Sequence, residues 1–146
     1  MKNKLSPRYQ KNKNFNKDLD ETIAIKPSLI KGAGNGAFAK INIKSGRKLG
    51  EYNGVLMGTE EYNALTDQSY IFEVAKKVQD KYYTFYIDAI NSGDSLRYVN
   101  GANTAKQKKK INVESYQYAG RIFFRANKDI KKGQELIIDY GDNYWH

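Results

Sequence analysis

Cysteine is absent from the sequence, and its single histidine is the final residue, His146. Without cysteine there is no disulfide framework, no thiolate zinc site and no cysteine nucleophile. One histidine at the end of the sequence argues against a Ser-His-Asp triad, a two-histidine metal site and a histidine base, so no metal site is expected. Any chemistry must therefore use tyrosines, carboxylates, lysines, backbone groups or a bound cofactor.

Long apolar runs are also missing. No run approaches the ~20 residues that span a bilayer, and residues 1–17 lack the apolar stretch of a secretory signal. We therefore expect an intracellular protein, nuclear or cytoplasmic, with no membrane partner. The length of 146 residues suits one compact domain rather than two.

Positive charge is unevenly distributed along the chain, whose formal net charge is +9. Residues 1–17 hold six basic and no acidic residues, which predicts a basic flexible arm before a single domain over residues 18–146. Four lysines stand within Lys106–Lys110. Each basic run is either simply a solvated part of the surface, as most such runs are, or it attracts nucleic-acid phosphates. Residues 51–94, with eight acidic and three basic residues, have the opposite sign and favour a basic peptide.

Hydrophobic and aromatic patterning predicts a mostly β protein with few short helices. Alternating, β-branched or aromatic segments indicate short strands over residues 22–26, 37–39, 48–52, 70–74, 82–88, 116–118, 121–124 and 136–139. The pair Ala119-Gly120 is typical of a hairpin turn. Residues 59–63 predict one or two helical turns with Thr59 as the N-cap.

Three glycines in five residues form the loop Gly32-Ala-Gly34-Asn-Gly36. The loop looks like a phosphate-binding loop, yet it lacks the Gly-Lys-Ser/Thr ending and no helical pattern follows it. By itself it indicates a tight turn whose backbone can be approached closely. Farther along, Glu135 and Asp139 are too far apart on a strand to act as a coupled acid–base pair. We expect Glu135 to bond backbone groups of a loop instead.

Six motifs, in order along the chain, resemble those of the SET domain of protein-lysine methyltransferases. They are Gly34-Asn-Gly-Ala-Phe-Ala39, Leu49-Gly-Glu-Tyr-Asn-Gly54, Tyr86-Ile-Asp-Ala89, Arg97-Tyr-Val-Asn-Gly-Ala102, Asn112 and Gly133-Gln-Glu-Leu-Ile-Ile-Asp-Tyr-Gly141. Each motif alone is weak, but their order and spacing over residues 20–146 make a specific signal. The form of the fourth motif is similar to that of the PR-domain subgroup and of compact stand-alone SET proteins.

The resemblance implies a fold and a cofactor. The fold would be a SET fold of several small β-sheets, with a C-terminal pseudoknot that brings Asn100 and Tyr140 together. The cofactor would be S-adenosylmethionine, released as S-adenosylhomocysteine. Its binding residues would be the backbone around Ala33, Gly34 and Asn35 at the methionine end, Asn100 and Gly101 at the adenine and the nearby amine, and Tyr144 with Trp145 over the adenine.

The resemblance also implies a catalytic site. Tyr140 would be the catalytic tyrosine, and Tyr52 would line the channel that admits the substrate lysine, together with Tyr70, Asp88 and Ile138. Because a phenol has a pKa of about 10, an orienting and electrostatic role suits Tyr140 better than that of a general base. Many relatives carry Phe or Tyr where Ile138 stands, so the number of methyl groups added stays open.

Three functions are compatible with these residues. The first is a protein-lysine N-methyltransferase acting on a histone or another basic, nucleic-acid-associated protein, with the arm from Lys2 to Lys17 and the Lys106–Lys110 run on nucleic acid. The second is a catalytically weak binding module tethered to nucleic acid by that arm, because Gly101 and Ala102 replace the family's usual His and Ser or Cys. The third is a small basic β-barrel that binds RNA. The oligomeric state stays open, a dimer included.

Overall fold

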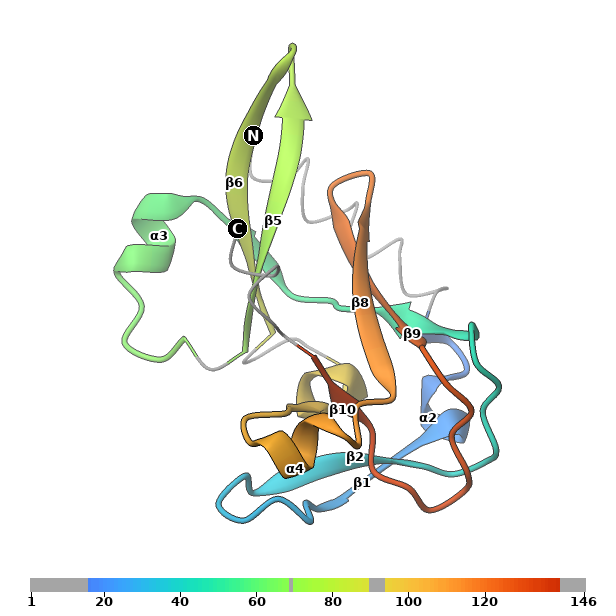
Figure 1. Cartoon of the computed structure of the whole chain (residues 1–146). Coiled ribbons are helices and arrows are strands. Elements are labelled where there is room, and N and C mark those ends of the chain that lie inside the picture. The colour runs from blue at the N-terminus through green and yellow to red at the C-terminus, as the bar shows by residue number, and fades with distance from the viewer. Residues whose placement is uncertain (1–15, 69, 90–93, 140–146) are drawn as a thin grey trace.

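The computed structural model describes residues 16–68, 70–89 and 94–139 of the 146-residue chain (Figure 1). Two strands form the first sheet, β1 (Ile23–Pro27) and β2 (Asn35–Ala39). Five strands form the second, in the order β3 (Lys48–Glu51), β9 (Arg121–Ala126), β8 (Val113–Tyr118), β10 (Ile137–Ile138) and β7 (Asn100–Gly101). Three strands form the third, in the order β4 (Val55–Met57), β6 (Lys81–Asp88) and β5 (Ile71–Val78).

Helices are few and short. They are α2 (Leu19–Thr22), α3 (Thr59–Asn63), α4 (Ala105–Lys108) and the 3₁₀ turn η2 (Ser95–Tyr98). The predicted fold class, mostly β with several small sheets and few short helices, is confirmed. The small β-barrel is wrong, because the strands of the described residues make three separate sheets rather than one closed sheet. None of the helices in this part of the chain is long and apolar enough to cross a membrane.

The first sheet is an antiparallel hairpin that carries the glycine loop between its strands. Pro27 pairs with Asn35 where the loop begins, so β1 runs one residue beyond the predicted strand; a proline is tolerated there because it stands at a strand end. Before the hairpin, Asn16 falls within the segment predicted as the arm. Its side chain donates to the Glu51 carbonyl (2.9 Å) and accepts the Glu51 N–H (2.7 Å), which joins this residue to β3.

Strands β5 and β6 pair along eight residues each and project from the body of the molecule as a hairpin (Figure 1). Gln79 and Asp80 form its turn with φ of 50° and 69°, both positive as a two-residue type I′ turn requires. The predicted strand over residues 70–74 is too short at its C-terminal end, because β5 continues to Val78. The C-terminal half of β5 is largely exposed, so its sequence does not show the alternation of buried and exposed residues that predicts a strand.

Helix α3 begins at the predicted residue, but Thr59 is not its N-cap. The cap is Gly58, whose backbone is extended (φ −88°, ψ −176°), and no side chain caps the helix. Thr59 already lies inside the helix, which makes the prediction wrong by one residue. Tyr62 of α3 stacks on Tyr86 of β6 with ring centroids 3.9 Å apart, so the helix is fixed on the third sheet by aromatic packing.

Three buried rings form the aromatic centre of the core. Tyr52 lies 4.5 Å from Phe72 and 5.5 Å from Phe124, measured between ring centroids, and the last two are 5.3 Å apart. Phe72 belongs to β5 and Phe124 to β9, so the cluster joins the three-stranded and five-stranded sheets. Each such pair contributes about 0.5–1.5 kcal/mol beyond its buried area.

The C-terminal segment is threaded between strands that precede it in sequence. β10 pairs in parallel with β7 on one side, Ile137 opposite Asn100 and Ile138 opposite Gly101, and with β8 on the other, Ile138 opposite Val113. The backbone bonds Asn112 N–H to Ile137 carbonyl (3.0 Å) and Ala102 N–H to Ile138 carbonyl (3.1 Å) accompany this pairing. The predicted pseudoknot is therefore present as far as the described residues extend.

Candidate functional site

The glycine loop, β7 and β10 converge although they lie far apart in sequence. The Asn100 side-chain N–H₂ donates to the Asn35 carbonyl (3.1 Å), and Gly101 pairs with Ile138. The structure thus brings together three of the predicted cofactor residues with one predicted channel residue. Tyr140, Tyr144 and Trp145 lie outside the described residues.

Two glycines shape the loop for different reasons. Gly34 has φ of +70°, and a Cβ there would meet nothing within 4 Å, so its backbone faces open space. Ala33, beside it, donates its N–H to the Ile30 carbonyl (3.1 Å) and so belongs to the turn. A Cβ on Gly36 would lie 2.3 Å from Oε2 of Glu135, which means that only glycine permits this approach.

Glu135 joins the loop to β7. Its buried carboxylate accepts the Leu29 N–H (2.9 Å) and the Ser28 hydroxyl (2.7 Å), and it accepts the Asn100 side chain at 3.4 Å. The expectation that Glu135 bonds backbone groups of a loop is confirmed. Because its oxygens are committed in this way, the carboxylate stabilises the arrangement rather than serving as an acid or base.

The residues at this convergence fit an amino-acid-bearing cofactor. The uncovered backbone at Gly34 leaves room for a ligand to approach. The side-chain carbonyl of Asn100 accepts no hydrogen bond from the residues that the structure describes, so it is available to an N–H or ammonium donor. These two groups stand on neighbouring segments, as a shared ligand requires.

The predicted channel residues form a second group around Tyr52. Its side chain is 2% exposed, and its hydroxyl donates to the Tyr70 carbonyl (2.9 Å). The same carbonyl accepts the Ala89 N–H (3.0 Å), which fixes the chain just after Asp88. Asp88 is buried at the end of β6, opposite Ile71. The Tyr70 carbonyl thus joins Tyr52 to Ala89, the residue after Asp88, whereas Ile138 belongs to the first group.

Arg97 orients this second group, and sequence reasoning gave it no role. Its guanidinium donates to the Ala89 carbonyl (3.1 Å) and to the Tyr98 hydroxyl (2.7 Å). It also lies over the rings of Tyr70 (5.6 Å) and Tyr98 (4.8 Å), measured to the centroids. The adjacent Arg97 and Tyr98 in the fourth motif indicate that the guanidinium could stack on the Tyr98 ring. The sequence does not indicate that it also stacks on the Tyr70 ring.

Asn112 is a second residue without a role in the sequence prediction. Its side chain donates to the Glu135 carbonyl (3.0 Å) and accepts the Ile137 N–H (2.8 Å), both in the buried interior. A single amide therefore pairs with the backbone on both sides of Leu136 and holds the threaded strand in place.

A buried ion pair lies immediately before Tyr52. Nε and Nη2 of Arg121 donate to Glu51 at 3.1 and 3.2 Å, and the Glu51 side chain is fully buried. Burial raises the pKa of Glu51, while the hydrogen bond and charge of Arg121, and the charge of Lys48, act against that rise. The pair ties β3 to β9 beside the aromatic centre of the core.

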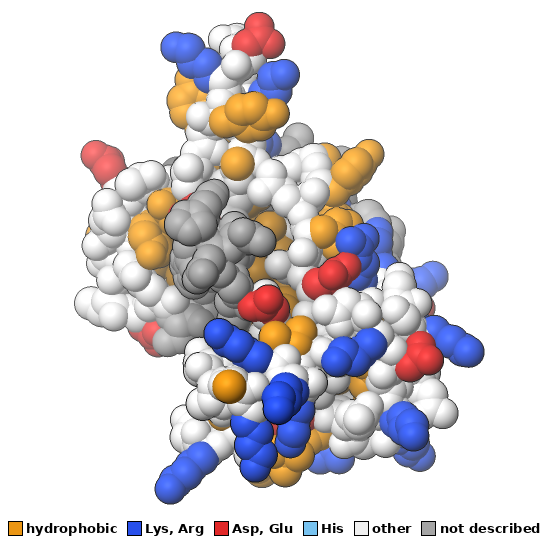
Figure 2. All heavy atoms as spheres, viewed as in Figure 1, with side chains coloured by type: hydrophobic (Ala, Val, Ile, Leu, Met, Phe, Trp, Pro, Cys, Tyr) orange, Lys and Arg blue, Asp and Glu red, His pale blue; other side chains and the backbone are white. Residues whose placement is uncertain are grey.

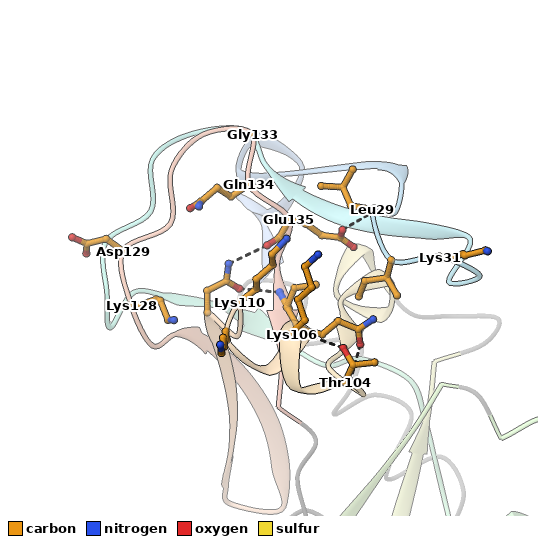
Figure 3. Close-up of a pocket in the computed structure, with 15 residues that line it drawn as sticks. Leu29, Lys31, Thr104, Lys106, Lys110, Lys128, Asp129, Gly133, Gln134 and Glu135 are labelled. Carbon is orange, nitrogen blue, oxygen red and sulfur yellow. Dashed lines mark hydrogen bonds between the residues drawn. The ribbon is translucent and has the colours of Figure 1, made fainter.

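A cavity of about 640 Å³ has Glu135 in its lining (Figure 3). Of the predicted cofactor and channel residues that the structure describes, none lines it. Its lining includes five lysines, Lys31, Lys106, Lys109, Lys110 and Lys128. In the described ranges, no cluster of three or more His, Cys, Asp or Glu could hold a metal ion.

Comparisons with known proteins identify similar chains. The family model of the PR domain of PR domain zinc finger protein 2 matches residues 23–146. PR domain zinc finger protein 14 of Mus musculus is 31% identical over 109 residues, which are 75% of this chain and 18% of that protein. Histone-lysine N-methyltransferase EZH2 of Chaetomium thermophilum is 29% identical over 135 residues, 85% of this chain and 8% of that protein. This chain therefore spans less than a fifth of either relative.

A solved structure shares the fold as well. The ATXR5 SET domain, in a complex with histone H3 dimethylated on R26, has a TM-score of 0.68 and 25% sequence identity. The match covers 81% of this chain and 57% of that one.

Proposed function

Because this chain belongs to the PR-domain family of SET-like domains, we propose that it is an S-adenosylmethionine-dependent protein-lysine N-methyltransferase. The observation that carries the proposal is the convergence of three distant segments. β10 lies between β7 and β8, and Asn100 of β7 bonds the glycine loop at Asn35. The strand that leads to Tyr140 is thereby fixed beside the residues proposed to hold the cofactor.

The cofactor is proposed to rest on the loop and β7. Backbone groups of Ala33, Gly34 and Asn35 hold the methionine end, and Asn100 with the Gly101 backbone holds the adenine and the amine. Tyr144 and Trp145, which lie outside the described residues, are proposed to cover the adenine. When bound, this cofactor supplies an electrophilic methyl group on a sulfonium, and S-adenosylhomocysteine is the product.

The protein's own task is to deliver a neutral amine. Lysine in water has a pKa of about 10.4, so its ammonium form must lose a proton before it attacks. A narrow channel walled by Tyr52, Tyr70 and Ile138 lowers that pKa by removing water from the charged form. Asp88 shapes the substrate side of this channel. The proton then leaves to solvent, which suits a chain whose single histidine is its last residue.

Tyr140 is proposed as the catalytic residue that positions the amine. Its hydroxyl orients the nitrogen and interacts with the charge that develops near the transferred methyl. Because β10 ends two residues before it and is paired on both sides, the backbone that carries Tyr140 starts from a fixed strand.

The proposed substrate is a lysine in a basic, histone-like protein. Residues 51–94 hold eight acidic and three basic residues, and exposed acidic side chains lie in and just after α3, at Glu60, Glu61 and Asp67, where they can attract such a peptide. The complex of the ATXR5 SET domain with histone H3 supports the same substrate class. With a histone-like substrate, the proposed enzyme would act inside the cell on proteins that associate with nucleic acid.

The test is methyl transfer from labelled S-adenosylmethionine to a histone mixture by the full chain. We expect transfer to lysine, and we expect Tyr140→Phe to lower its rate by about 10²–10³-fold. Cofactor binding by calorimetry should be unchanged in that variant, which separates catalysis from folding. Absence of transfer to every lysine-rich protein, with the cofactor bound, would overturn the proposal.

One observation favours a second candidate, a catalytically weak binding module. Gly101 and Ala102 stand where the resemblance expects His and Ser or Cys, so the backbone contact remains but a side-chain contact is lost. Such a module would be tethered to nucleic acid by the arm from Lys2 to Lys17, of which residues 1–15 lie outside the described residues. Peptide binding without transfer in the same assay identifies this alternative.

A further inference from the structure

The cavity that Glu135 lines is built from three separate segments. They are the loop at Leu29–Lys31, α4 with the residues just after it, and the loop from Lys128 to Ile137. Figure 3 shows Lys106 and Lys110 extending from the α4 side into the cavity. In the space-filling view, Lys and Arg side chains gather over the same region (Figure 2). Segments far apart in sequence thus place positive charge around one hollow.

The five lysines of this cavity have no partner among the residues that the structure describes. Across residues 16–68, 70–89 and 94–139, none of their ammonium groups makes an ion pair or a side-chain hydrogen bond. Two carboxylates also line the cavity. Glu135 is committed to the glycine loop, and Asp129 accepts the Ser45 N–H (2.9 Å) and points outward in Figure 3. The positive charge is therefore left for an external anion.

The backbone that carries these lysines is held firmly. Thr104 caps α4 by accepting the Gln107 N–H (3.1 Å), and the Gln107 side chain accepts the Thr104 N–H (3.2 Å), a reciprocal capping box. Asn112 fixes the segment from Glu135 to Ile137, which also lines the cavity. Binding an anion here requires ordering of side chains but not of backbone, which lowers the entropic cost of binding.

The lining also indicates which anion fits. Among the described residues it contains lysine but no arginine, and a lysine ammonium binds phosphate as a point charge, without the fixed bidentate geometry of a guanidinium. Its described lining contains no aromatic ring on which bases could stack. All five lysines are exposed, as contact with a long, hydrated polyanion requires. Lys131 and Lys132, in the adjoining turn, extend the basic surface beyond the cavity.

We propose that the lysine-lined cavity binds the phosphate backbone of nucleic acid without reading its sequence. The ligand chemistry is a chain of phosphodiesters, supplied by duplex DNA or by single-stranded RNA. The proposal deepens the nucleic-acid association suggested for the arm, but it is independent of methyl transfer. Nucleic-acid binding is measured without the cofactor. A failure to bind nucleic acid can therefore be distinguished from a failure to transfer methyl groups.

The experiment measures binding of the full chain to a labelled duplex DNA and to a single-stranded RNA of the same sequence, over a salt series. The variant Lys106→Gln/Lys110→Gln removes two cavity lysines, and glutamine preserves the helix propensity of α4. The matched control Lys77→Gln/Lys81→Gln removes the same charge from the exposed β5–β6 hairpin. Thermal unfolding checks that both variants are folded.

We expect the cavity variant to lower the slope of log affinity against log salt by about 2 on duplex DNA, close to one for each lost phosphate contact. The control should leave that slope nearly unchanged. Lys128→Gln, on a different segment, should lower it by about 1 if the cavity rather than α4 alone is the site. The nucleic acid with the larger change in slope identifies the preferred source of the phosphates.

Three results would overturn the proposal. Equal losses in the cavity variant and the control would show that net charge alone attracts nucleic acid. Unchanged binding in the cavity variant would place the contacts elsewhere. Loss of binding to a polyglutamate peptide, with nucleic-acid binding intact, would assign the cavity to an acidic protein instead.

Discussion

The buried ion pair between Glu51 and Arg121 makes the free energy of unfolding depend on pH. The substitution Arg121→Met tests the direction of that dependence. The Glu51 side chain is fully buried, whereas that of Arg121 is 20% exposed. Burial raises the pKa of Glu51, and Arg121 is the main group that opposes the rise. Arg121→Met keeps an apolar stem of similar length but leaves the carboxylate without its guanidinium.

Breaking a buried pair by removing one partner costs about 3–5 kcal/mol, and the partial exposure of Arg121 favours the lower end, about 3 kcal/mol. The sign follows from the pKa of Glu51. Because the folded pKa lies above the ordinary value of 4.5, and rises further without Arg121, the folded variant binds a proton that the unfolded chain has already released. Stability of the variant is therefore lost as pH rises from 4.5 through the raised pKa, and the deficit shrinks on acidification.

Urea unfolding followed by circular dichroism, near pH 5 and near pH 8, measures this deficit. The control is Arg125→Met, which removes an exposed pair with Glu114 whose side chains are 43% and 40% exposed. Its loss should be at most about 1 kcal/mol at both pH values. The reasoning is refuted if Arg121→Met loses no more than the control near pH 8, or if its deficit is the same at both pH values.

Three further substitutions test the site. Gly36→Ala should destabilise the chain by about 1–3 kcal/mol, because its Cβ would displace the Glu135 carboxylate from its hydrogen bonds; chemical unfolding measures the loss, and a stability equal to wild type would contradict the close approach. Asn112→Ala should cost about 2–5 kcal/mol, since two buried backbone groups lose their partner; protection from hydrogen exchange in β10 should fall with it, and unchanged protection would argue against the clamp. Tyr52→Phe should cost only about 0.5–1.5 kcal/mol, because the Tyr70 carbonyl keeps a second donor; a loss of methyl transfer far beyond that effect would support the channel role, and unchanged transfer would remove it.

Local patterns predicted most of the strands because these strands are short and apolar on a buried face. The segment around Phe72 and Val74 alternates, and both residues are buried in β5. The same rule stops at the exposed outer half of that strand, where the pairing is set by the hairpin turn at Gln79 and Asp80. α4 was also missed as a helix, because its four residues depend on the capping pair rather than on apolar periodicity.

The candidate site was predictable from motifs but its internal contacts were not. Composition and spacing give no reason for Asn100 to lie beside Asn35, and the resemblance to a known fold supplied that proximity. Neither the motifs nor the resemblance indicated that Arg97 stacks on Tyr70, because the two residues are far apart in sequence and meet only through folding. The cavity was missed for a similar reason: Lys31, Lys106 and Lys128 become neighbours only through folding.

The threaded strand β10 also constrains the order in which the contacts of the fold can form. Within the described residues, the facing edges of β7 and β8 are both paired by β10, and synthesis delivers residues 137–138 after both of these strands. A nascent chain can form the β5–β6 and β8–β9 hairpins early, since their contacts are local, whereas the pairing of β7 must wait for a contact that spans 37 positions, from Asn100 to Ile137. The nascent polypeptide is thus expected to bring Asn100 and the glycine loop into their final arrangement later than it forms the two hairpins.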